Sequence, residues 1–226
     1  MKQYKYLDIA TVAFVVTLFL SDFVGNAKVA HVSTFTFTSG VILFPFSYLL
    51  GDVLTEVYGY SKSRRVIWIS FGALIVSAII IKIMILLPPA REWHNQQAFE
   101  IIFGDTWRTV LASIVAFWAG EFANSFTLAK MKIVTSGKYL WTRTIGSTVV
   151  GEGVDSLIFY PLAFVGLAGF SWHLIFSVMI CNYILKVLWE VIATPFTYKV
   201  VGFLKKAEHE DFYDYKTDFN PFVAEK

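Results

Sequence analysis

The sequence predicts an all-α, polytopic membrane protein with six transmembrane helices and both termini in the cytoplasm. Three observations carry this prediction. Hydrophobic residues make up 56% of the 226 residues and charged residues only 16%, with a mean hydropathy of +0.60, which is too apolar for a soluble domain of this size. Long apolar segments recur along the chain, and the Lys and Arg residues are concentrated on one side of them.

Each of six apolar segments is close to the length of about 20 residues that a helix needs to cross about 30 Å of hydrocarbon. These segments are Leu7–Val24, Phe35–Val57, Val66–Leu87, Trp107–Ala129, Ile145–Ala168 and Leu174–Val201. We do not expect a cleavable signal peptide, because Asp8 interrupts the start of the first segment and no small-x-small cleavage site follows it.

The basic residues predict the orientation of the helices. Of the 19 Lys and Arg residues, 14 fall on one side: Lys2, Lys5, Lys62, Arg64, Arg65, Lys130, Lys132, Lys138, Arg143, Lys199, Lys205, Lys206, Lys216 and Lys226. Only three, Lys28, Arg91 and Arg108, fall on the other. Because loops rich in Lys and Arg stay in the cytoplasm, both termini are expected there.

We expect one transmembrane domain over residues 1–204 and a polar cytoplasmic tail over residues 205–226. The longest outer connection, Pro88–Asp105, suits either a short surface helix or a flexible lid. Cys181 is the only cysteine, so no disulfide can form within one chain. The spacing of Ala116 and Gly120 is compatible with a homodimer held by close helix packing.

Ionisable residues within or at the edges of the apolar segments are the feature that points to function. They are Asp52, Glu56, Glu121, Glu152, Asp155, Lys186 and Glu190. A charged group near the middle of a bilayer costs about 2.5–3.5 kcal/mol, so these groups must pair, take up a proton or line a wet cavity. Six acids against one lysine leave excess negative charge, which favours protonated carboxyl groups or a ligand that donates hydrogen bonds.

Helical spacing brings these residues to one level. A rise of 1.5 Å per residue puts Glu121, Glu152 and Asp155 roughly 10–15 Å from the predicted cytoplasmic ends. Steps of three or four residues place amide and aromatic side chains on the same faces. The predicted substrate-binding residues are Asp155, Glu152, Glu121, Asp52, Lys186, Glu190, Asn124, Asn182, Tyr48, Trp118, Phe159 and Tyr183. We expect them to share a polar cavity in the cytoplasmic half.

Structural roles are the alternative explanation for some of these residues. Buried polar groups also join transmembrane helices through interhelical hydrogen bonds. Glu56 could form a solvated pair beside Arg64 and Arg65, and Lys186 could form a purely structural ion pair with Glu190.

Several classes of protein do not fit the sequence. The four histidines, His31, His94, His173 and His209, are scattered, so no His-Glu-x-x-His metal site is present. The Gly-x-x-x-x-Gly-Lys-Ser/Thr motif of an ATP-driven pump is also absent. The net charge of +2 follows from topology and indicates no nucleic-acid surface. We therefore expect a protein that is not an enzyme and has no catalytic residue, metal or cofactor.

Motifs along nearly the whole chain resemble those of a known family. They are FPFSYLLGDVLTEVYG at residues 44–59, SRR at 63–65, GEGVDS at 151–156, KVLWE at 186–190 and YDYKTDFNPF at 213–222. The chain is similar in these motifs to the bacterial queuosine precursor transporters, also grouped as putative vitamin uptake transporters. The resemblance implies a multi-pass protein of the bacterial inner membrane that imports 7-deazaguanine bases, such as 7-cyano-7-deazaguanine, 7-aminomethyl-7-deazaguanine or queuine.

The predicted residues suit such a ligand. A guanine-type edge presents N1–H and a 2-amino group as adjacent donors that one carboxylate accepts together, while amide or ammonium groups donate to the base carbonyl and aromatic rings stack on the heterocycle. The candidates are Asp155 and Glu152 as acceptors, Asn124, Asn182 and Lys186 as donors, and Trp118, Phe159 and Tyr183 for stacking. A cationic aminomethyl group would favour a further acid, Asp52 or Glu121.

One alternative function remains open from the sequence. Six-helix vitamin-binding subunits that work with a separate ATPase have a similar size, so the chain could be the substrate-binding membrane subunit of such a system. Purification with or without a co-isolating ATPase separates the two. In both cases the expected partners are a small-molecule substrate and the lipid bilayer.

Overall fold

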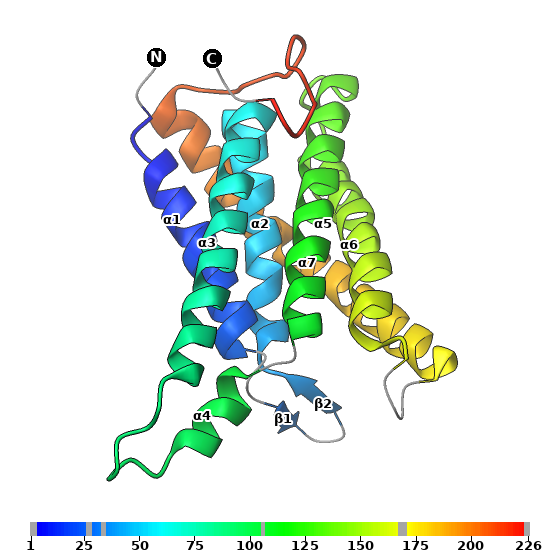
Figure 1. The fold of residues 1–226 in the computed structure, drawn as a ribbon. Coiled ribbons are helices and arrows are strands. Elements are labelled where there is room, and N and C mark those ends of the chain that lie inside the picture. Colours follow the sequence, from blue (N-terminus) through cyan, green and yellow to red (C-terminus); the bar gives the residue numbers. More distant parts are fainter. Residues whose placement is uncertain (1–3, 26–28, 33–34, 105–106, 167–170, 224–226) are drawn as a thin grey trace.

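The computed structural model describes residues 4–25, 29–32, 35–104, 107–166 and 171–223, in which six long helices form a bundle (Figure 1). In chain order the elements are α1 (Leu7–Phe19), the π-helix η1 (Leu20–Gly25), β1 (Val29–Val32), β2 (Phe35–Thr38), α2 (Gly40–Tyr58), α3 (Tyr60–Leu86), α4 (Gln96–Phe103), α5 (Trp107–Val134), α6 (Leu140–Phe164) and α7 (Trp172–Glu208). The prediction of a helical membrane protein is confirmed.

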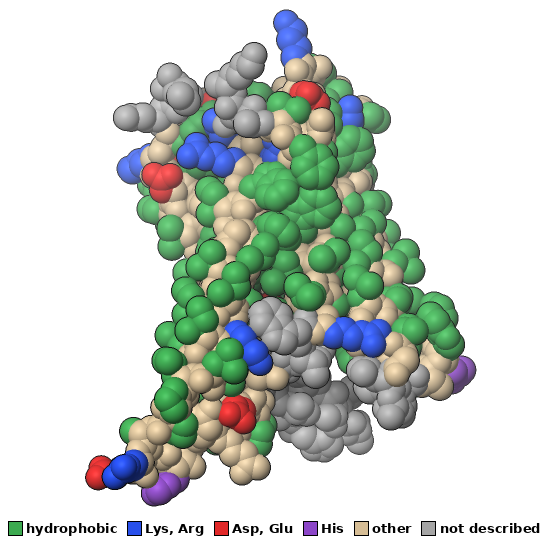
Figure 2. All heavy atoms as spheres, in the orientation of Figure 1, with side chains coloured by type: hydrophobic (Ala, Val, Ile, Leu, Met, Phe, Trp, Pro, Cys, Tyr) green, Lys and Arg blue, Asp and Glu red, His purple; other side chains and the backbone are tan. Residues whose placement is uncertain are grey.

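Each of the six apolar segments overlaps with one of the long helices, most of which extend beyond the predicted bounds. Among the described residues, three helical stretches are long and apolar enough to cross a membrane: α3, residues 110–134 of α5, and α7. Hydrophobic side chains cover the middle of the face in Figure 2, whereas charged side chains gather at the upper end and in the lower third. Exposed apolar side chains such as Ile83, Leu188 and Ile192 suit contact with lipid.

The second apolar segment is not helical from its start. Residues Phe35–Thr38 form β2, which pairs antiparallel with β1 from Val29↔Thr38 to Val32↔Phe35, and α2 begins only at Gly40. The prediction of a helix from Phe35 is therefore wrong. The alternation of aromatic and β-branched residues in Phe-Thr-Phe-Thr favours a strand.

Helix α7 is longer than the predicted segment. Its 37 residues correspond to about 55 Å at 1.5 Å per residue, compared with about 30 Å of hydrocarbon. It crosses the bundle diagonally in Figure 1. The helix ends at Glu208, so the tail outside the bundle begins at His209 rather than at residue 205.

The outer connection contains α4, a short helix with no buried residue. Of the two structures considered for Pro88–Asp105, a short surface helix is the one observed in its described part. The side chain of Gln96, at the start of α4, donates to the Ile85 carbonyl oxygen at 3.1 Å. This bond ties α4 to the end of α3.

The two ends of the described chain lie close together. Near the N-terminus the Tyr6 amide donates to Glu208 Oε1 at 2.6 Å, and the Tyr58 hydroxyl donates to the same oxygen at 3.0 Å. N and C both lie at the upper end of the bundle in Figure 1. An even number of membrane crossings would give this arrangement.

A tight turn at Gly59 joins α2 to α3 at this end. Gly59 has a φ of +85°, and a Cβ there would lie 2.2 Å from Cδ1 of Phe212 in the tail. Only glycine satisfies both the backbone conformation and the lack of space. The turn thus lets the tail pack directly against the ends of α2 and α3.

The tail crosses the end of the bundle and binds to α3. Arg64 donates to the carbonyl oxygens of Asp218 and Asn220 at 2.9 and 2.7 Å, and Trp68 Nε1 donates to the Pro221 carbonyl oxygen at 2.8 Å. Arg65 is exposed. The alternative of a solvated pair between Glu56 and these two arginines is therefore wrong, because Glu56 is buried and Arg64 is bound to the tail.

Glu56 instead lies at the centre of a buried ionic network. The Arg143 guanidinium donates to both carboxylate oxygens at 2.7 Å. Lys205 lies 2.5 Å and Lys132 3.5 Å from Oε1. These cations come from α6, α7 and α5, so one carboxylate of α2 joins four helices. Arg143 and Lys132 are among the 14 basic residues that predict the orientation of the helices, and they also hold the bundle together.

Candidate functional site

Five acidic residues lie in the interior of the bundle at mid-helix. They are Asp52 on α2, Glu121 on α5, Glu152 and Asp155 on α6, and Glu190 on α7, and each is at most 6% exposed. They are held at the middle of the helices, whereas the sequence suggested a level in the cytoplasmic half. All five are thus buried in the bundle, but of the five only Asp155 is among the residues that line the cavity described below.

Two glycines bring α5 and α6 close together beside these acids. A Cβ on Gly120 would lie 2.9 Å from Asp155 Cβ and 3.0 Å from the Gly151 carbonyl oxygen, and a Cβ on Gly151 would lie 2.7 Å from Asn124 Cβ. Only glycines permit this approach. Ala116, one turn from Gly120, is also buried. Both small residues thus serve packing within the chain, and their spacing no longer supports a homodimer.

Asp52 is anchored by polar groups of α5 and α6. Its Oδ1 accepts from Asn124 Nδ2 at 2.7 Å and from the Ser147 hydroxyl at 3.3 Å. Asn124, which was predicted to contact substrate, therefore has its amide nitrogen committed to Asp52. The remaining oxygen of each side chain, Asp52 Oδ2 and Asn124 Oδ1, is buried without a hydrogen-bond partner.

Lys186 pairs with α6. Its ammonium group lies 2.8 Å from Glu152 Oε2 and 3.3 Å from Asp155 Oδ2, and it sits 4.1 Å from the centre of the Phe44 ring. The alternative of a Lys186–Glu190 ion pair is wrong, because both oxygens of Glu190 are buried without a hydrogen-bond partner. Spacing along α7 suggested this pair, but the α6–α7 interface presents two carboxylates to the lysine.

A cavity extends from this ion pair towards the end of the bundle opposite the termini. It leaves about 130 Å³ open to the centres of water molecules, which is room for several waters, because one water takes up about 30 Å³ in the liquid. The lining residues are Ser21, Asp22, Gly40, Phe44, Pro45, Ser113, Asp155, Phe159, Tyr160, Asn182 and Lys186.

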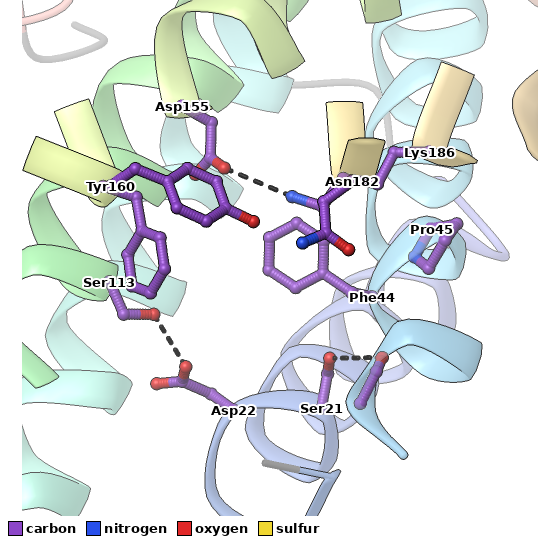
Figure 3. A pocket seen from close by; sticks show the side chains of 11 residues that line it. Ser21, Asp22, Phe44, Pro45, Ser113, Asp155, Tyr160, Asn182 and Lys186 are labelled. Carbon is purple, nitrogen blue, oxygen red and sulfur yellow. Dashed lines mark hydrogen bonds and ion pairs between the residues drawn. The ribbon is translucent and has the colours of Figure 1, made fainter. Parts of the chain in front are cut away.

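Figure 3 shows the polar groups that face this cavity. Asp155 and Tyr160 from α6 point towards Asn182 and Lys186 from α7, and the Phe44 ring lies between them and the lower rim. The cavity thus combines a carboxylate, an ammonium group, an amide and aromatic rings. Such a set can hold a flat heterocycle that has both donors and acceptors on its edges.

The π-helix η1 supplies two lining residues that the sequence-based list did not include. The Ser113 hydroxyl donates to Asp22 Oδ1 at 2.7 Å, and the Ser21 hydroxyl donates to the Gly40 carbonyl oxygen at 3.2 Å. Single-turn π-helices are frequent at functional sites. The sequence does contain an indication of these two lining residues. Asp22 places a carboxylate near the end of the first apolar segment, next to Ser21, where a purely lipid-facing helix would have apolar residues.

Two of the predicted aromatic contacts lie elsewhere. The Trp118 ring packs on Trp68, Phe122 and Phe222, at centroid distances of 5.8, 5.3 and 5.8 Å, on the side of α5 that faces α3 and the tail. The Tyr183 hydroxyl donates to the Val149 carbonyl oxygen at 3.2 Å, between α7 and α6. Neither side chain lines the cavity, whereas Phe159 does.

Tyr48 lies behind the cavity rather than in its wall. Its hydroxyl is buried without a hydrogen-bond partner and lies 2.8 Å from the position of a Cβ on Gly120. Phe44, one turn earlier on α2, takes the lining position. Within the described residues, no group of three or more His, Cys, Asp and Glu side chains is arranged to hold a metal ion.

Comparisons with known proteins agree with this architecture. Residues 38–200 match the family described as putative vitamin uptake transporter. The chain is 28% identical over 172 residues to a protein of Bacillus subtilis named "Probable queuosine precursor transporter", covering 76% of this chain and 74% of that protein.

A second relative is more distant. The "Queuosine precursor transporter" of Escherichia coli is 23% identical over 164 residues, covering 72% of this chain and 71% of that protein. No solved structure matches. The family match runs from α2 into α7, and these helices supply most of the cavity and all five of the mid-helix acids. The apolar helices and the internal polar cavity suit a transport role. The chain belongs to the putative vitamin uptake transporter family.

Proposed function

We propose that this transporter imports queuosine precursors, which are 7-deazaguanine bases such as 7-cyano-7-deazaguanine, 7-aminomethyl-7-deazaguanine or queuine. The names of the two relatives support the substrate class. The observation that carries the proposal is the meeting of Asp155, Asn182 and Lys186 with aromatic rings in one internal cavity.

Each polar group has a counterpart on a 7-deazaguanine. The Asp155 carboxylate would accept the adjacent N1–H and 2-amino donors, because one carboxylate can take two parallel hydrogen bonds. Lys186 or Asn182 would donate to the base carbonyl oxygen. The rings of Phe44, Phe159 and Tyr160 supply the apolar surface for the flat heterocycle.

The charge around the cavity affects which substituent at position 7 of the base is bound more tightly. Glu152 and Asp155 share one lysine, so the three groups together have a formal charge of −1. A cationic aminomethyl group would be attracted by this excess, whereas a neutral cyano group would not need it. Comparing the affinities of the two bases in high and low salt measures this contribution.

We further propose that six helices cross the bacterial inner membrane with both termini in the cytoplasm. The distribution of Lys and Arg supports this orientation, as does the position of both chain ends at one end of the bundle. The residues of the tail would then lie on the cytoplasmic surface. The cavity, nearer the opposite end, would face the periplasm.

Uptake by the purified protein tests the proposed function. Proteoliposomes that contain only this chain should take up labelled 7-cyano-7-deazaguanine, and excess unlabelled compound should compete. Empty liposomes are the control for leakage. If uptake required ATP and a co-purified ATPase, the chain would be the binding subunit of a larger system. If none of the three bases entered, the proposed substrate class would be wrong.

A further inference from the structure

Glu121 is a fully buried carboxyl group without a partner. Its side chain is 0% exposed, and neither oxygen has a hydrogen-bond partner. By contrast, the buried carboxylates of Glu56 and Glu152 are paired with cations at 2.7 and 2.8 Å. A carboxylate that is buried, ionised and unpaired is strongly disfavoured, so the neutral acid is the form that this environment stabilises.

The groups around Glu121 add to this preference. Tyr48 and Asp52 of α2, and Glu152 and Asp155 of α6, are close enough to interact with it electrostatically. From α1 the apolar side chain of Phe14 lies beside Glu121, because a Cβ on Gly51 would meet both side chains. Lys186 of α7 is paired with the two acids of α6 rather than with Glu121.

The carboxyl group of Glu121 is closely packed. A Cβ on Gly51 would lie only 1.9 Å from Glu121 Oε1, so the carboxyl group lies directly against the backbone of α2. A proton needs no additional ligand or space.

Glu121 also lies between two sets of acids. Towards the cavity lies Asp155, which lines it. Towards the chain termini lies the side chain of Asp52, whose partners Asn124 and Ser147 are nearer that end of α5 and α6. Glu190 belongs with Asp52 to the second set. It lies one turn beyond Lys186 on α7, and neither of its carboxyl oxygens has a hydrogen-bond partner.

We propose that Glu121 carries a proton in the conformation observed and releases it in another conformation of the transport cycle, so that substrate import is coupled to proton movement. This inference rests on the proposed transport function and identifies the proton as the ion whose gradient drives import. A ligand that donates hydrogen bonds to Asp155, or displaces Lys186, changes the electrostatic field at Glu121. Substrate and proton binding are then linked, and each alters the affinity for the other.

Infrared spectroscopy tests the proton without any substrate. At neutral pH the purified protein should show the absorption band of a protonated carboxyl group, shifted in ²H₂O, and this band should weaken in Glu121→Gln. Glu92→Gln, in the exposed connection before α4, is the matched control and should leave the band unchanged. A Glu121→Gln spectrum identical to the parent would overturn the proposal.

Transport in proteoliposomes tests the coupling. With the membrane potential held at zero and the interior one pH unit more alkaline, one proton per substrate gives about tenfold accumulation of neutral 7-cyano-7-deazaguanine. The parent and Glu92→Gln should reach this ratio. Glu121→Gln should reach only equal concentrations on both sides, while still exchanging internal for external substrate, because exchange requires no net proton movement.

The possible outcomes separate the coupling from the proposed function. If the parent equilibrates the base but ignores the pH gradient, or accumulates it only with a sodium gradient, the proton proposal is overturned and the transport function stands. If the parent does not transport the base, the proposed substrate fails, and the infrared measurement alone decides whether Glu121 carries a proton. Retained exchange and a monodisperse elution profile show that Glu121→Gln is folded.

Discussion

The Arg143 guanidinium and the Glu56 carboxylate form a bidentate pair, with Nε and Nη2 donating to separate oxygens at 2.7 Å. Both side chains are at most 1% exposed. Lys132 and Lys205 join the network from α5 and α7, and both also pair with Asp211 of the tail, at 2.6 and 2.8 Å. Lys132 also donates to the carbonyl oxygen of Phe212 at 2.7 Å, so the network fastens the tail to the bundle.

Removing the central charge of this network should destabilise the protein. Glu56→Gln leaves three cations around a neutral amide, and breaking a buried pair in this way costs about 3–5 kcal/mol. Arg143→Lys keeps the charge but loses the bidentate geometry, so it should cost less. The midpoint of thermal unfolding in detergent measures both, with the exposed Glu92→Gln as control. A Glu56→Gln midpoint equal to that of the parent would mean that the network contributes no stability.

The contact between α5 and α6 should not tolerate a methyl group at Gly151. A Cβ there would lie 2.9 Å from the Gly120 carbonyl oxygen, and this backbone cannot move aside easily. Gly151→Ala should destabilise by about 1–3 kcal/mol, the usual cost of overpacking. Gly72→Ala is the matched control, because a Cβ on this α3 glycine meets nothing within 4 Å; it should be neutral or stabilising, by up to about 1 kcal/mol. Equal effects of the two substitutions would contradict the close helix contact.

The proposed topology predicts which surface positions react with a reagent that cannot cross the membrane. Cys181 is exposed and is first replaced by serine. Single cysteines at Lys62 or Lys138 should then react only after the membrane is opened, whereas a cysteine at Glu92 should react in intact cells. The reverse pattern would place the termini outside the cytoplasm.

The membrane class and the grouping of the acids were predictable from the sequence. Apolar segments of membrane-crossing length have few alternatives, and the cost of burying a charge limits where Glu121 or Glu152 can go. Helical spacing also showed that Asp155 and Phe159 share a face, and both line the cavity.

The choice of partners was not predictable, because it depends on how the helices are rotated against one another. Lys186 has Glu190 one turn away in its own helix but pairs with two carboxylates of α6. Arg143 is 87 residues from Glu56 in the sequence, and nothing near either residue indicates the other. Trp118 lies within an apolar segment, three residues before Glu121, as a ligand-stacking residue would. Its ring instead packs on Trp68 of α3 and Phe222 of the tail.

Direct binding of 7-cyano-7-deazaguanine to the purified protein and to Asp155→Asn tests the proposed recognition of the base most directly. Asparagine keeps the size of the side chain but presents a donor to the N1–H and 2-amino donors, so affinity should fall by about 1.5–3 kcal/mol, or roughly 10- to 150-fold. Folding should survive, because Glu152 still holds Lys186 at 2.8 Å; monodispersity is the check. The expected result is tight binding by the parent and by Glu92→Gln, with this loss in Asp155→Asn. Equal affinity of the parent and a well-folded Asp155→Asn, or no binding of any 7-deazaguanine by the parent, would contradict the assignment.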